Sequence, residues 1–190
     1  VMYLDALVIA EAVHNNGGIV MMQVQKMVKK ATLHPKAVRI PGYLVDIVVV
    51  DPAQTQLYGG APVNRFISGD FTLDDSERVK IPLNQRKVVA RRALYEMKKG
   101  AIGNVGVGIA DGIGLVAREE GCDEDFVLTV ETGPIGGITT QGVAFGANVN
   151  TRAILDMTAQ FDFYHGGGLD VCYLSFAEVD QHGNVNVHKF

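Results

Sequence analysis

The first third of the chain carries two kinds of apolar pattern. Residues 5–14 are rich in helix formers and are followed by Asn15-Asn16-Gly17-Gly18, which predicts a helix that ends there. A β-branched and Met-rich run over residues 19–28 predicts a strand. A second strand is predicted over residues 43–50, where the unbroken apolar run at 47–50 indicates burial on both faces, as in a parallel sheet.

Residues 51–84 are richer in turn formers and charge, and they predict an irregular connection across a domain boundary rather than a site. A helix is predicted to follow, with Asn84 as its N-cap. Apolar residues at helical spacing carry this helix through to Gly100: Val88, Val89, Ala93, Leu94 and Met97.

The second half of the chain alternates between strands, glycine turns and helices. Strands are predicted at residues 101–107, 126–130, 169–176 and 185–187. Helical segments are predicted at 108–118 and at 150–157, the second capped by Asn150 or Thr151. This alternation predicts an α/β fold, with a mostly parallel sheet and flanking helices. In such folds ligands bind at the carboxyl ends of the strands, where these glycine turns lie.

The composition narrows the class of protein. The 190 residues are 47% apolar and 20% charged, which can support a packed core, and the net charge is −4. This balance disfavours a nucleic acid as the main partner, because phosphate backbones are bound by basic domains or stripes. Of the 22 glycines, 16 lie between Gly100 and Gly183. Dense glycine indicates a backbone that turns sharply or approaches a ligand closely, so the second half is predicted to hold the site.

Cys122 and Cys172 stand far apart, and the five histidines are isolated in the sequence. We therefore predict no disulfide framework and no metal site, and we expect a reducing, cytoplasmic compartment. No apolar run approaches the roughly 18 residues that a membrane helix requires, so a membrane partner is not expected. Because the sequence starts at Val1 without Met, we expect it to be a piece of a longer protein.

Glu131 is the strongest candidate for a reacting group. It directly follows the predicted strand 126–130 and precedes the turn formers Gly133 and Pro134, so its carboxylate would project from a rigid sheet beside glycine amides. A glutamate is already ionised at neutral pH and can act as a covalent nucleophile without an activating base. The alternative is a glutamate that caps the following turn or forms a surface ion pair.

The segment from Gly103 to Gly114 predicts a second kind of site. A strand, a glycine turn and a helix would place a phosphate at the helix N-terminus. The spacing from Gly106 is GxGxxxG, however, one residue longer than the usual dinucleotide fingerprint, and Asp111 puts a negative charge where a pyrophosphate would lie. A noncatalytic α/β module that binds a nucleotide-like ligand through this loop is therefore the alternative function.

A collinear series of motifs runs along most of the chain. Their order is more specific than any glycine pattern, and with them the chain resembles the family I coenzyme A transferases. The motifs are Gly18 to Val28, Ile40 to Asp46, the helix Arg86 to Lys99, the Gly-x-x-x-Asn-x-Gly-x-Gly-Ile run from Gly100 to Ile109, the segment around Glu131, Gly167 to Val171, and Val179 to Asn186.

The residues around Glu131 resemble one branch of that family. Many members have Ser-Glu-Asn-Gly there, whereas this chain has Val130-Glu131-Thr132-Gly133, which is similar to the fused, single-chain acetate, propionate or 3-ketoacid type. Two glycine loops of the family, one early in the α-like half and one expected after Phe190, are missing from this sequence. The resemblance implies that residues 1–80 are the C-terminal part of an α-like domain plus a connection, and that residues 81–190 begin a β-like domain.

The resemblance also implies the chemistry. CoA would pass between a short-chain acyl-CoA and a free, acetate-type carboxylic acid by a ping-pong mechanism, through a glutamyl-CoA thioester on Glu131. Asn104 and Gly133 would orient Glu131 or supply oxyanion donors, with the alternative that Asn104 only braces its loop. The wall that binds CoA or substrate would be formed by three loop residues: Gly106, Val107 and Gly108.

The family needs no cofactor other than CoA itself as a substrate. The resemblance implies a role in short-chain fatty acid and ketone body metabolism. The implied partners are acyl-CoA, a short-chain carboxylate, the remainder of a CoA-transferase chain, and further copies in a homo-oligomer. Because family loops are missing from the sequence, we expect the 190 residues alone to give weak or no turnover.

Overall fold

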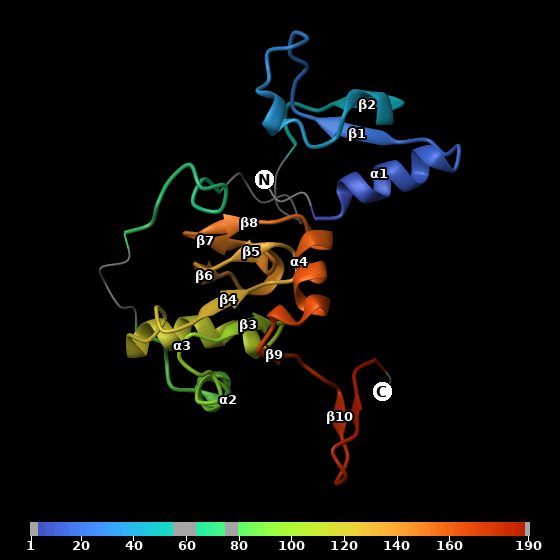
Figure 1. Cartoon of the computed structure of the whole chain (residues 1–190). Helices are drawn as coiled ribbons and strands as arrows, with labels where there is room; N and C mark the ends of the chain where they lie inside the picture. The colour runs from blue at the N-terminus through green and yellow to red at the C-terminus, as the bar shows by residue number, and fades with distance from the viewer. Residues whose placement is uncertain (1–3, 55–63, 75–79, 189–190) are drawn as a thin grey trace.

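Two groups of secondary structure follow one another along the chain in the computed structural model, which describes residues 4–54, 64–74 and 80–188 (Figure 1). The first group holds α1 (Ala6–Asn15), β1 (Met21–Val24) and β2 (Ile47–Val50). The predicted helix and both strands are confirmed, although the strands are shorter than predicted. They pair in parallel, with Met21 opposite Ile47.

The prediction that β2 is buried on both faces is wrong for this chain. Its four residues, Ile47 to Val50, are each 41–49% exposed. β2 belongs to a two-stranded sheet with β1, and among the described residues α1 contacts the short 3₁₀ turn Gly42–Leu44 before the strand. An apolar run therefore predicted the parallel pairing correctly and the burial incorrectly.

The second group is built on a five-stranded sheet in the order β8-β5-β4-β3-β9. The central strand β3 (Ile102–Val105) is parallel to both neighbours, β4 (Val127–Thr129) and β9 (Val171–Tyr173). Two shorter strands, β5 (Pro134–Ile135) and β8 (Ala153–Ile154), extend one edge in antiparallel fashion. The predicted α/β class with a mainly parallel central sheet is confirmed.

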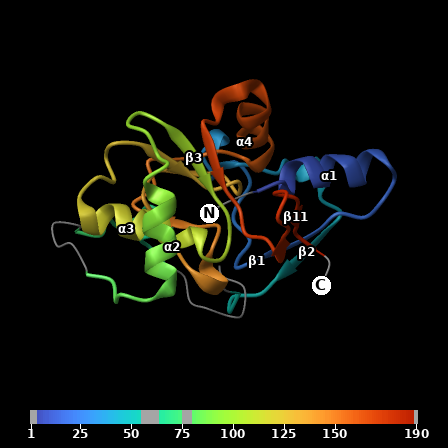
Figure 2. The same ribbon diagram turned by 90° about the horizontal axis from the view of Figure 1, so that it is seen from below.

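Helices lie on both faces of this sheet (Figures 1 and 2). They are α2 (Gln85–Leu94), α3 (Ile113–Glu120) and α4 (Met157–Phe163). Two short hairpins complete the described strands: β6 (Ile138–Thr139) with β7 (Asn148–Val149), and β10 (Glu178–Val179) with β11 (Val185–Asn186). Residues 55–63 and 75–79 of the predicted connection lie outside the described residues, and the division into domains at residue 80 stays a prediction.

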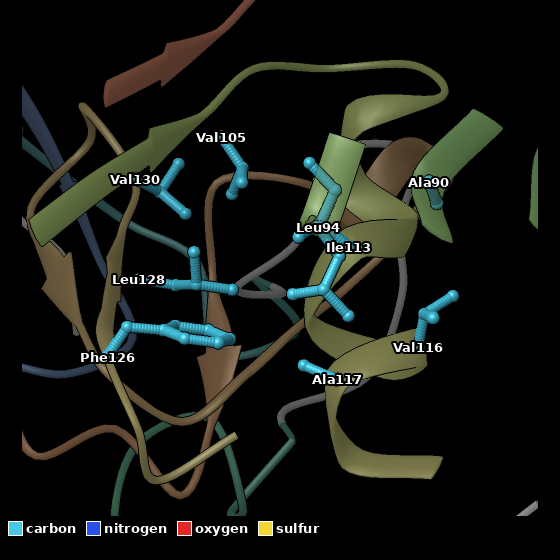
Figure 3. Packing of buried hydrophobic residues seen from close by; sticks show 9 residues of the cluster. All are labelled: Ala90, Leu94, Val105, Ile113, Val116, Ala117, Phe126, Leu128 and Val130. Atoms are coloured by element: carbon cyan, nitrogen blue, oxygen red, sulfur yellow. The ribbon is translucent and has the colours of Figure 1, made fainter. Parts of the chain in front are cut away.

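Alternation along β4 assigns its residues to the two faces. Phe126, Leu128 and Val130 are buried in the core together with residues of α2 and α3 (Figure 3). The other members of this core are Ala90, Leu94, Val105, Ile113, Val116 and Ala117. Thr129 points the other way, toward α4, where its hydroxyl lies 2.6 Å from the phenol oxygen of Tyr164. One face of the sheet is thus apolar, and the other carries polar groups at the strand ends.

The predicted start of α2 is confirmed, and its predicted apolar stripe needs correction. Asn84 Oδ1 accepts a hydrogen bond from the Lys87 amide at 3.0 Å, which is an N-cap. Val88 and Val89 are 54% and 49% exposed, so this part of the predicted stripe is wrong. The rest of the stripe packs against the core, where Leu94 and also Ala90 are buried, and the helix ends at Leu94 instead of continuing to Gly100. α2 packs on α3 along this narrower face.

The predicted helix over residues 150–157 is wrong. Asn150 has a positive φ of 56°, and its side chain is bonded in both directions to the backbone of Leu73, at 2.8 and 2.9 Å, instead of capping a helix. The chain then pairs with β5 through β8. The helix begins only at Met157, so α4 was missed as an element.

Asn84→Ala should loosen the first turn of α2, because a lost N-cap costs about 1 kcal/mol. We expect amides of residues 85–88 to exchange hydrogen about fivefold faster, measured by mass spectrometry on the peptide that contains them. Asn84→Ser retains a capping oxygen and serves as the matched control, with exchange close to wild type. Equal exchange in the alanine and serine variants would contradict the assignment of this cap.

Candidate active site

Three polar side chains lie side by side at the carboxyl ends of three adjacent parallel strands. Asn104 in β3 lies directly opposite Thr129 in β4 and opposite Cys172 in β9. Because residues opposite one another share a face of the sheet, these side chains form one row on the α4 side. Asn104 is buried, and its Nδ2 donates to the Cys172 sulfur at 3.7 Å. The row therefore places a carboxamide at the centre of the strand ends.

Glu131 lies two residues beyond Thr129, just past the end of β4. Val130 between them is fully buried in the core, which fixes the point where the chain leaves the sheet. The Glu131 carboxyl is partly buried, and its Oε2 is buried without a hydrogen-bond partner in the described part of the chain. The alternatives of a turn cap or a surface ion pair thus find no partner among residues 4–54, 64–74 and 80–188. Burial of a polar oxygen without a partner carries a desolvation cost, so the position of this carboxylate calls for an explanation.

The turn after Glu131 depends on Gly133. Its φ is +118°, its amide donates to Val130 O at 2.9 Å, and its carbonyl accepts from the Leu155 amide at 3.0 Å. A Cβ at this position would collide with the Leu155 carbonyl oxygen. The Gly133 amide is therefore engaged within the turn, and in this conformation the residue shapes the backbone beside Glu131.

Sequence reasoning missed two residues of this face, Tyr164 and Gln160, because it did not predict α4. The Tyr164 phenol lies at the end of that helix and donates to Asn104 Oδ1 at 3.1 Å. Gln160, one turn earlier and fully buried, donates to the phenol oxygen at 2.8 Å. A glutamine with no evident local role in an aromatic-rich stretch, Gln160-Phe161-Asp162-Phe163-Tyr164, was the available signal.

Burial raises the pKa of the Tyr164 phenol, and the negative charge of Glu131 acts in the same direction. Hydrogen bonds from Gln160 and Thr129 partly oppose the shift. The phenol is therefore protonated at neutral pH and available as a hydrogen-bond donor.

The loop Gly106 to Gly108 runs past the end of β3 with its backbone held from two sides. The Gly106 amide donates to Tyr173 O at 2.8 Å, and Ser175 Oγ donates to Val107 O at 2.7 Å. Arg86 Nη2 donates to Gly108 O at 2.7 Å. The Val107 side chain is 58% exposed, so the loop presents an apolar surface at the strand ends.

Arg86 also lies beside the carboxylate of Asp111, which is buried. The Asp111 carboxylate is only 2% exposed, lies 3.6 Å from Arg86 Nη2 and accepts from Gln141 Nε2 at 2.7 Å. A buried carboxylate therefore stands directly before α3, where a dinucleotide phosphate would need a cavity of positive potential. This arrangement disfavours the nucleotide-like ligand site that the sequence offered as an alternative.

Nothing in the described ranges suggests a metal centre, since no three His, Cys, Asp or Glu side chains gather there in a group that could hold an ion. A search of the same residues for membrane spans finds no helix with the length and apolar character to cross a bilayer.

Gly133→Ala should be far more damaging than an ordinary glycine substitution at positive φ. Gly142→Ala is the matched control, because Gly142 has a φ of +63° and a methyl group added there would meet no atom within 4 Å. We expect Gly142→Ala to cost about 1–2 kcal/mol from backbone strain alone, and Gly133→Ala to cost more, since its Cβ must displace the Leu155 carbonyl. Thermal unfolding measures the difference, and equal midpoints for the two variants would contradict it.

Comparisons with known proteins agree with this description. A family model described as Coenzyme A transferase matches residues 1–51. The acetate CoA-transferase YdiF of Escherichia coli (strain K12) is 90% identical over 190 residues, which are 100% of this chain and 36% of that protein. The caffeate CoA-transferase of Acetobacterium woodii is 40% identical over 188 residues, 98% of this chain and 36% of that protein.

A solved structure gives the same result in three dimensions. The crystal structure of acyl-CoA transferase YdiF from E. coli O157:H7, in a thioester complex with CoA, matches with a TM-score of 0.88 and 85% identity, over 100% of this chain and 34% of that chain. This chain therefore spans about a third of the length of the relatives it matches. The family expected from the collinear motifs is confirmed: the chain belongs to the family I coenzyme A transferases.

Proposed function

We propose that the protein containing this chain transfers CoA between a short-chain acyl-CoA and a free, acetate-type carboxylic acid, with Glu131 as the nucleophile. One observation carries the proposal: Glu131 Oε2 is buried without a hydrogen-bond partner in the described part of the chain, at the carboxyl end of a core strand. The names of the relatives, acetate CoA-transferase and caffeate CoA-transferase, support the reaction class.

The proposed exchange is ping-pong. The Glu131 carboxylate attacks the acyl carbonyl of acyl-CoA, the carbon–sulfur bond breaks, and a mixed anhydride and the CoA thiolate form. The thiolate then attacks the Glu131 carbonyl of the anhydride, which releases the first carboxylate and leaves a glutamyl-CoA thioester. An acceptor carboxylate runs the same two steps in reverse and leaves with CoA.

Each attack on a carbonyl creates an oxyanion that needs a hydrogen-bond donor. Asn104 is our candidate, because its Nδ2 has only the Cys172 sulfur as a partner among the described residues, and a thiol sulfur is a weak acceptor. Since the Gly133 amide is engaged with Val130 O, we assign Gly133 to shaping the turn.

The remaining groups contribute to binding. We propose that the loop of Gly106, Val107 and Gly108 forms a wall for CoA or substrate, since the exposed Val107 lies just past the end of β3. A carboxylate is a weak nucleophile, so much of the acceleration has to come from binding the remote part of CoA. The rest of the longer chain, and further copies in a homo-oligomer, are the proposed partners in forming that surface.

Glu131→Gln and Glu131→Ala, introduced in the full-length protein, should lower CoA exchange by at least about 10³-fold, because the nucleophile is lost while the fold is kept. Wild-type protein incubated with acyl-CoA should carry a CoA adduct on the peptide that contains Glu131, detected by mass spectrometry. Glu124→Gln is the matched control, because Glu124 is an exposed carboxylate that pairs with Arg152 on the surface. An adduct on another peptide, or wild-type exchange in Glu131→Gln, would overturn the proposal.

The 190 residues alone should show weak or no turnover, at least about 10²-fold below a protein of the relatives' length, because remote CoA contacts contribute to the rate. A coupled assay of free CoA release at equal molar concentration measures the ratio. Robust exchange by the 190 residues would show that the surface needed for CoA lies within them.

A further inference from the structure

The Tyr164 side chain joins three separate elements of the described site face. Its phenol oxygen lies 2.6 Å from Thr129 Oγ1 of β4, 3.1 Å from Asn104 Oδ1 of β3 and 2.8 Å from Gln160 Nε2 of α4. The negative charge of Glu131 adds to the effect of burial in raising the pKa of this phenol. The phenol therefore connects the helix to the carboxamide, on the face of the sheet where Thr129 lies two residues before Glu131.

Hydrogen-bond chemistry limits the direction of these bonds. The Gln160 amide nitrogen can only donate, so the phenol oxygen accepts from it. Thr129 has one hydroxyl hydrogen, which it can donate to the phenol oxygen at 2.6 Å or to Gly103 O at 3.0 Å. When Thr129 donates to the phenol, the single hydrogen of the phenol is the donor for Asn104 Oδ1 at 3.1 Å.

This donor decides which end of the Asn104 carboxamide points where. At the other end, the Cys172 thiol is both a weak donor and a weak acceptor, so it distinguishes poorly between the amide oxygen and the amide nitrogen. Only the phenol requires the oxygen on its side. With that requirement met, the amide nitrogen lies on the opposite side and keeps one N–H without a partner in the described structure.

Resting on the proposed function, we propose that Tyr164 is a positioning residue for CoA transfer: its phenol orients the Asn104 carboxamide so that an N–H is held ready for the oxyanion formed at Glu131. Tyr164 itself does not touch the reacting atoms in this role. It acts through Asn104, and loss of the phenol hydrogen would allow the carboxamide to rotate.

The structure holds the phenol firmly enough for such a role. The Tyr164 ring makes an edge contact with Phe161, at 5.9 Å between ring centroids, and a tilted contact with Phe163 at 6.0 Å. Tyr164 directly follows α4 and begins the turn Tyr164–Gly168, in which Gly167 leaves the helical conformation with a φ of +90°.

The close contact of Phe163 with Gly168 shows how tightly this turn is packed. A Cβ on Gly168 would overlap the Phe163 ring, so a residue larger than glycine would displace the ring. The ring contacts with Phe161 and Phe163, and the packing of Phe163 against this glycine, together limit how the phenol can move. A phenol with little freedom can orient the carboxamide at small entropic cost.

A double-mutant cycle in the full-length protein tests the proposal. The rate of CoA adduct formation on Glu131 is measured at saturating acyl-CoA for wild type, Tyr164→Phe, Asn104→Ala and the double variant. Removal of one oxyanion donor lowers such rates by about 10²–10³-fold, so we expect about 10²-fold for Asn104→Ala. We expect about tenfold for Tyr164→Phe, with KM for acyl-CoA changed by less than about twofold.

The rate of the double variant shows whether Tyr164 acts through Asn104. If Tyr164 acts through Asn104, Tyr164→Phe should add nothing, within about twofold, in the Asn104→Ala background. Tyr95→Phe, which removes an exposed phenol at the end of α2, is the matched control and should react as wild type. Multiplied losses in the double variant, or a wild-type rate in Tyr164→Phe, would overturn the proposal.

Failure of the proposed function would look different. In that case the wild-type adduct would be missing from the Glu131 peptide, or Glu131→Gln would still exchange CoA. The same cycle read on steady-state kcat would then still report whether Tyr164 and Asn104 act as one unit. Coupling between Tyr164 and Asn104 without an adduct on Glu131 would contradict only the assignment of Glu131 as the nucleophile. An adduct on Glu131 without that coupling would contradict only the role of Tyr164.

Discussion

The parallel pairing of β3 with β4 and β9 is the constraint on which the rest of the site depends. Its register sets Asn104 opposite both Thr129 and Cys172, and its alternation sends Phe126, Leu128 and Val130 into the core. A slip of one residue would exchange the two faces, burying polar groups in the core and turning the apolar ones toward α4. Core packing and site geometry are therefore set by the same register, and the burial of Val130 holds the exit point of Glu131.

Local patterns were enough to predict much of this arrangement. The core strand before Glu131, the glycine turn after it and the helix cap at Asn84 are each encoded by residues only a few positions apart. The structure contains all three features. The position of Glu131 at a strand end follows from the same short-range signals. The lack of a hydrogen-bond partner for its Oε2 among the described residues is seen only in the folded chain.

Long-range contacts account for what the sequence could not predict. Asn150 looks like a helix cap locally, but it bonds to Leu73, 77 residues earlier, and the expected helix becomes a strand. Tyr164 reaches the site because its phenol is hydrogen-bonded to Asn104 and Thr129, and Gln160 is hydrogen-bonded to the same phenol. Asn104 and Thr129 are at least 31 residues away from both in sequence. The apolar run of β2 looked like a buried strand because periodicity reports pairing and side-chain character, whereas burial depends on a covering layer.

That exposed strand has a practical meaning for handling the chain. β2 is a row of four β-branched residues without charge, in a sheet of two strands, so one of its edges has no strand partner in the described structure. Unpaired apolar edges recruit other chains into intermolecular sheets. A preparation of these 190 residues would accordingly be prone to self-association through Ile47 to Val50, and a single lysine placed in that row would act as a gatekeeper against it.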